Sequence, residues 1–139
     1  MRHNLSYQVR VGLVAVAAMA YPLVGHANQF ESWVGVWEGQ LEGKPGVTVT
    51  LGRDGGDLQG TIVFNVVARG DGEEPHVIGH DAHVLTHVNL EGSTLGFHVI
   101  RLGDGRELHL TMRLTDGDKA VLECADCGGP GATELARVK

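Results

Sequence analysis

The chain has 139 residues, with 17 acidic against 11 basic side chains and a formal net charge of −6. This acidic balance argues against binding to nucleic acids or to anionic membrane surfaces, because both require a basic face. The length corresponds to one domain with a modest core.

The first 27 residues have the pattern of a secretory signal peptide. Arg2 and Arg10 form a basic start, residues 11–24 are apolar and uncharged, and Gly25-His26-Ala27 offers small residues for cleavage. The apolar segment is too short for a membrane span, and no later segment is long or apolar enough. We therefore expect a secreted or periplasmic protein without a transmembrane segment, and a single domain over residues 28–139.

Beyond residue 27, turn signals recur about every ten residues between alternating apolar runs, which is typical of an antiparallel barrel or sandwich. The first predicted strand, 33–41, carries Gly35, Trp37, Gly39 and Leu41 on one face. The segment 68–81 is polar and acidic, and it is predicted to be a long loop with room for a short edge strand at 76–78. Further strands are predicted over residues 47–51, 58–66, 83–90, 94–101, 107–115, 120–124 and 133–138.

The turn signals also predict how the strands pair. With Asp54-Gly55 as a two-residue hairpin turn, Leu51 faces Leu58, and the same count across the preceding turn places Leu51 beside Trp37. The apolar residues of three strands then share one face. We therefore expect an all-β fold, an up-and-down antiparallel barrel of about eight strands.

Gly35-Val36-Trp37 on the first strand resembles the G-x-W signature of lipocalins and their calycin relatives. The resemblance implies a barrel in which Trp37 closes one end and a basic residue of the last strand, matched by Arg137, packs over it. Gly35, Trp37 and Arg137 are thus expected to be structural residues. In length and strand rhythm the chain also resembles avidins, but it lacks their tyrosine and additional tryptophans, so biotin binding does not carry over.

The predicted inner face is almost purely apolar. An eight-stranded barrel either fills with its own side chains or holds one small ligand, and composition does not distinguish the two. No serine-hydrolase, zinc-protease or phosphate-loop motif is present. The first hypothesis is therefore a non-enzymatic barrel that binds a small apolar molecule. The expected ligand-binding residues are Trp37, Leu51, Phe64, Thr86, Phe97, Leu110 and Met112.

The histidines lead to a second hypothesis, a periplasmic protein that binds zinc, copper or nickel. His98 and His109 are predicted to lie directly opposite each other on neighbouring strands, with His87 diagonal to His98. Cross-strand neighbours are close enough for imidazoles to share a metal ion. The plain alternative is a solvated face that carries histidines without function.

Residues 76–87 allow another reading, in which histidines at spacings of four, three and four share one face of a metal-binding helix. Gly79 and its β-branched neighbours disfavour that helix. The histidines concerned are His76, His80, His83 and His87.

Cys124-Ala125-Asp126-Cys127-Gly128 has the form of half a zinc-ribbon site. Metal binding through Cys124 and Cys127 requires two further ligands, and a redox pair lacks the helix that lowers the thiol pKa. In an oxidising compartment a disulfide between the two cysteines is favoured. No cofactor is predicted apart from a possible metal ion.

The bacterial barrels that inhibit metalloproteases share a similar first strand, and this resemblance implies a third hypothesis. It is a protein-interaction barrel with a protein partner, such as a protease inhibitor, that acts through its N-terminal tail, Asn28–Ser32.

Overall fold

The computed structural model describes residues 29–41, 44–127 and 131–139. The predicted signal peptide of residues 1–27 lies outside the described residues. Residues 29–31 form one short helical turn, and the regular structure that follows is entirely strand. Within the described ranges, no helix reaches the length and hydropathy that crossing a membrane requires.

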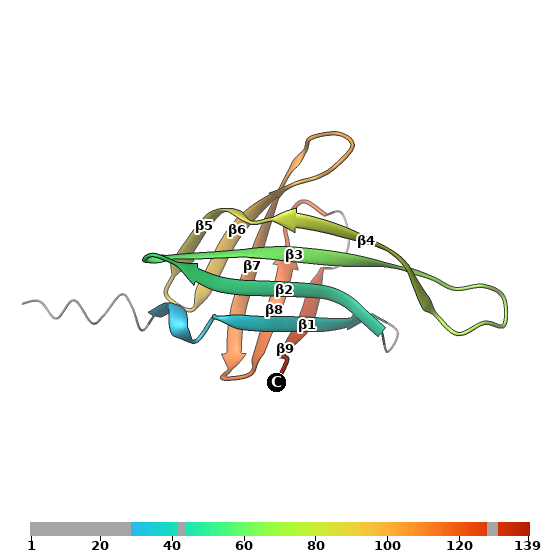
Figure 1. Ribbon diagram of the computed structural model, residues 1–139, viewed down its shortest axis with the longest axis horizontal. Helices are drawn as coiled ribbons and strands as arrows, with labels where there is room; N and C mark the ends of the chain where they lie inside the picture. Colours follow the sequence, from blue (N-terminus) through green and yellow to red (C-terminus); the bar gives the residue numbers. More distant parts are fainter. Residues whose placement is uncertain (1–28, 42–43, 128–130) are drawn as a thin grey trace, which may run out of the picture.

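Nine strands of the described chain form a single curled antiparallel sheet (Figure 1). Their order across the sheet is β4-β3-β2-β1-β9-β8-β7-β6-β5. The strands are β1 (Gly35–Leu41), β2 (Lys44–Asp54), β3 (Asp57–Ala68), β4 (His76–Val84), β5 (Thr86–Glu91), β6 (Thr94–Ile100), β7 (Glu107–Asp116), β8 (Lys119–Cys124) and β9 (Ala132–Arg137).

The two edge strands, β4 and β5, follow one another in the chain with only Leu85 between them. Because strand direction alternates across the sheet, β4 and β5 run the same way, and they pair with β3 and β6 respectively. Leu85 N–H donates to the Gly60 carbonyl at 3.0 Å, and His83 Nδ1 lies 3.0 Å from the Ile100 carbonyl oxygen. The sheet is therefore barrel-like, and the predicted antiparallel all-β class is confirmed.

The β2–β3 hairpin pairs two residues away from the predicted register. Leu51 faces Gly60, because the turn lies one residue further on, with Gly55 as its first central residue. Gly55 has a φ of 65°, which glycine adopts without strain. The register of β1 and β2 also differs from the prediction by two residues, so Trp37 faces Val49 and not Leu51. Since side chains alternate with a period of two, a shift of two leaves every residue on its predicted face.

The prediction of a long loop over residues 68–81 is wrong in its extent, and the short edge strand predicted at 76–78 is the start of β4. β3 continues to Ala68 and β4 begins at His76, so their hairpin projects beyond the neighbouring strands (Figure 1). The polar sequence concealed the full length of this strand because β4 is a sheet edge on which most side chains reach solvent. The predicted strand over residues 83–90 is divided between β4 and β5 at Leu85, which is buried, whereas Val84 is 70% exposed. The alternative helix over residues 76–87 is also wrong.

Trp37 and Arg137 close one end of the sheet. The Trp37 side chain is fully buried, and its indole N–H donates to the Trp33 carbonyl at 2.9 Å. Arg137 pairs with Trp37 across β1 and β9, as expected, and its guanidinium lies 4.2 Å from the Trp37 ring centroid. Gly35 has a φ of 140°, and a Cβ there would lie 2.8 Å from Arg137 Nη1. A side chain at position 35 would therefore displace the arginine.

The concave face of the sheet holds the hydrophobic core. The core residues on the strands occupy alternate positions, and Trp33 and Leu85 join them from outside the strands. The buried members are Trp33, Trp37, Val47, Val49, Leu51, Leu58, Ile62, Leu85, Leu95, Phe97, Val99, Leu110, Met112, Ala120, Leu122 and Leu135.

Candidate functional site

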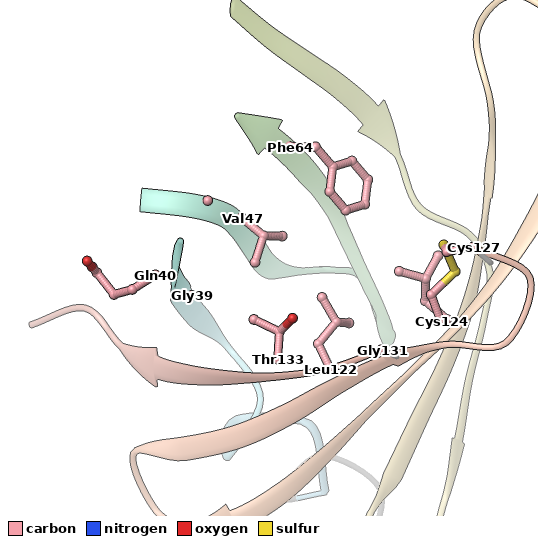
Figure 2. A pocket seen from close by; sticks show the side chains of 11 residues that line it. Gly39, Gln40, Val47, Phe64, Leu122, Cys124, Cys127, Gly131 and Thr133 are labelled. Carbon is pink, nitrogen blue, oxygen red and sulfur yellow. A yellow bond between two sulfur atoms is a disulfide. The ribbon is translucent and has the colours of Figure 1, made fainter. Parts of the chain in front are cut away.

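A cavity of about 290 Å³ lies at the end of the sheet opposite Trp37, where β1 and β8 finish and β2 and β9 begin (Figure 2). Val47, Phe64 and Leu122 point into the same space, and the Cys124–Cys127 disulfide forms one side of it. β1 adds no side chain at Gly39, which also lines the cavity. The walls are therefore mainly aliphatic, aromatic and sulfur surface.

A second cavity of about 290 Å³ shares Phe64 and Cys127 with the first and adds polar side chains. Among these is His83, whose side chain is only 6% exposed. His83 Nε2 lies 3.0 Å from Asp81 Oδ2, and its Nδ1 contacts a backbone carbonyl of β6. Arg101 also lines this space. A polar region therefore adjoins the apolar cavity.

Cys124 and Cys127 form a disulfide, with their Cα atoms 5.5 Å apart. This agrees with the favoured prediction for the pair. Because both sulfurs are used in the bond, neither is a thiolate ligand in this structure, and the metal hypothesis has no support from the cysteines.

The structure does not gather the seven expected ligand-binding residues around one cavity. Phe64 and Leu110 line the first cavity. Thr86, the one polar residue among the seven, instead donates from its hydroxyl to the His98 carbonyl at 3.1 Å. The other four are packed within the core and do not line this cavity, namely Trp37, Leu51, Phe97 and Met112. Sequence reasoning left the disulfide, Gly39 and Thr133 out of the binding site, because their positions depend on how the strand ends converge.

The structure does bring the three candidate metal-binding histidines together on the outer face of β5, β6 and β7. His98 pairs directly with His109, as predicted, and the rings of His87 and His98 are neighbours. Two carboxylates that sequence reasoning missed, Glu107 and Asp126, join them. Glu107 was within reach of a sequence argument, because it lies two residues before His109 on the same face of its strand.

Glu107 is held in its charged form by its surroundings. The hydrogen bond with His98 holds the pKa of Glu107 below its ordinary value, and the nearby rings of the other two histidines act in the same direction. An ionised carboxylate beside imidazole nitrogens has the composition of a metal-ligand set.

The N-terminal segment expected to act as an inhibitory tail is folded against the domain where it is described. Asn28 lies outside the described residues. Phe30 packs on the core, and Arg53 Nη1 donates to Glu31 Oε1 at 2.7 Å. The described part of the segment is therefore not a free extended tail.

Comparison of the chain with protein-family models, with curated proteins and with solved structures finds no match.

Proposed function

We propose that this chain is an exported, non-enzymatic β-barrel that binds a small apolar molecule at the end opposite Trp37. The observation that carries the proposal is the cavity between Val47, Phe64 and Leu122. Apolar cavities favour apolar occupants, because each Å² of apolar surface removed from water contributes about 25 cal/mol.

The size of the cavity limits the ligand. Its volume of about 290 Å³ is at the lower end of small-molecule sites. Since a cavity of about 150 Å³ holds benzene, this one suits a molecule of about twelve non-hydrogen atoms. Both ring nitrogens of His83 are already in contact with protein groups, but the half-exposed Asp81 carboxylate lines the adjoining space and can accept a hydrogen bond beside Phe64. The proposed ligand is therefore a small aromatic or branched aliphatic molecule with a single polar group.

The proposal includes a lipocalin-like barrel and export from the cell. The stacking of Arg137 on Trp37 supports the first part, because it matches the arrangement that the G-x-W resemblance implies. The basic start, the apolar segment of residues 11–24 and the small residues up to Ala27 support the second part.

Titration with 1-naphthylamine tests the proposal, because it is an aromatic molecule within this size limit with a single polar group, and its emission shifts to shorter wavelengths in apolar surroundings. Thr133→Phe places a ring in the cavity, whereas Thr50→Phe places the same ring at an exposed position on β2. We expect saturable binding by the unaltered protein and by the Thr50 variant. Binding by the Thr133 variant should be weaker by at least about tenfold, or about 1.4 kcal/mol.

Absence of saturable binding, or equal binding by the Thr133 and Thr50 variants, contradicts the proposed function. Native mass spectrometry of the protein taken from its own exported fraction then addresses the natural ligand. A retained organic mass that is absent from the Thr133 variant identifies the molecule held in the cavity.

A further inference from the structure

Three histidines and two carboxylates gather on the outer face of the sheet, away from the core. His87 belongs to β5, His98 to β6, and Glu107 and His109 to β7. The ring centroids of His98 and His109 are 4.2 Å apart, and those of His87 and His98 are 4.9 Å apart. Strand pairing by itself therefore holds three imidazoles side by side.

The ligand atoms of His87, His98 and Glu107 are close enough to share one ion. His98 Nδ1 lies 2.6 Å from Glu107 Oε1, and His87 Nε2 lies 3.9 Å from the same oxygen. One ligand atom from each of the three residues lies within 4.8 Å of the others. Ligands of a tetrahedral zinc ion are separated by about 3.3 Å, so only small side-chain rotations are needed.

The backbone at His87 is a second, independent observation. Among the described residues, His87 is the one non-glycine residue with a positive φ, at 49°. It lies in the irregularity of the β5–β6 ladder between Thr86 and Asn89. Bulges of this kind redirect a side chain, and strained residues gather at binding sites. Here the ring that the bulge presents is 71% exposed and lies beside His98.

Asp126, in the loop that follows β8, contacts the cluster through His109. Its Oδ2 lies 2.8 Å from His109 Nδ1 and accepts the His109 backbone N–H at 3.1 Å. The His109 ring in turn packs edge-on against His98. Asp126 lies between Cys124 and Cys127, so the disulfide loop holds it in place. Asp126 therefore fixes the orientation of His109, and His109, which is not itself one of the three residues that could share an ion, limits the movement of the neighbouring His98 ring.

We propose that His87, His98 and Glu107 bind one divalent transition-metal ion, with zinc the closest fit. Two imidazole nitrogens and one carboxylate suit zinc, copper or nickel, whereas calcium and magnesium take shells of oxygen ligands. Three protein ligands leave a fourth position for water. The site is on the outer face, so it is independent of the proposed apolar ligand.

Titration of the purified protein with Zn²⁺ against a chromophoric chelator tests the site. His87→Gly removes the ring and accepts the positive φ, His98→Ala removes the central ligand, and Glu107→Gln keeps the size and a hydrogen-bond acceptor for His98. Each variant should bind Zn²⁺ at least about tenfold more weakly than the unaltered protein. His76→Ala is the matched control, because His76 is an exposed histidine on β4 outside the cluster.

Circular dichroism without metal establishes that each variant is folded. The ligand-field absorption of the Co²⁺-loaded protein gives a second readout, and we expect its intensity to fall in all three variants. Failure of the unaltered protein to bind Zn²⁺, or undiminished binding by the His87 or His98 variant, overturns the site. Undiminished binding by the Glu107 variant overturns the proposed ligand set. All three variants should bind naphthylamine as the unaltered protein does. Failure of the metal site and failure of the cavity proposal therefore give different results.

Discussion

Replacing Arg137 with methionine removes the contacts that close the Trp37 end of the sheet and keeps most of the aliphatic volume. The Arg137 guanidinium stacks over Trp37 and donates to the backbone carbonyls of Ser32 and Val34. Its Nε also lies 3.4 Å from Asp118 Oδ1. The arginine side chain is only 20% exposed, so water screens these contacts incompletely.

The expected loss in the free energy of unfolding can be estimated from these contacts. Hydrogen bonds from a charged donor contribute about 1.5–3 kcal/mol each, and stacking of a cation on an aromatic ring about 0.5–2 kcal/mol. Asp118 is half-exposed, so its ion pair contributes less than about 1 kcal/mol. Methionine recovers part of the packing on Trp37. We expect Arg137→Met to lower the free energy of unfolding by about 3 kcal/mol, a large share of the total of about 5–15 kcal/mol.

Urea unfolding followed by far-UV circular dichroism measures this loss without depending on Trp37 emission, which the substitution itself changes. Arg137→Lys is the comparison, because lysine keeps the charge but lacks the planar fork that reaches two carbonyls. The free energy of unfolding of the Arg137→Lys variant should lie between those of the unaltered protein and of Arg137→Met. If both variants remain within about 0.5 kcal/mol of the unaltered protein, the reasoning about this end of the sheet is refuted.

Three further predictions concern backbone and loop positions. Gly35→Ala should lower the free energy of unfolding by about 2 kcal/mol, because its Cβ would meet a guanidinium nitrogen at 2.8 Å and its φ is positive; thermal unfolding measures this. Gly60→Ala should lower the free energy of unfolding by about 2 kcal/mol or more, because the added Cβ would meet a backbone oxygen at 2.1 Å. Gly52→Ala in the paired strand is the control: its Cβ would meet nothing within 4 Å, so it should be nearly neutral in the same assay. The double variant Cys124→Ser and Cys127→Ser should lose at most about 2 kcal/mol, since the disulfide closes a very short loop; a larger loss in urea unfolding contradicts that account.

Strand alternation made the fold class and the inner face readable in the sequence. Trp37 and Leu51 were placed on the inner face although their predicted register was wrong by two residues, because a displacement of two keeps each side chain on its face. The pairing of His98 with His109 was also readable, because both are in strands with clear alternation. The first three residues of the β4 strand were readable but its full length was not, because an edge strand in contact with water needs no apolar alternation.

For the candidate sites too, some features could be predicted from the sequence and others could not. The sequence by itself determined the curled antiparallel architecture, the inward apolar face and the neighbouring histidines of β6 and β7, because these depend on local periodicity. Only the tertiary structure decided which part of the interior stays open, that Glu107 and Asp126 join the histidines, and that His87 adopts a positive φ. A cavity depends on the sum of side-chain volumes, and a bulge or a distant carboxylate depends on how separate strands converge; neither is encoded in any single stretch of the chain.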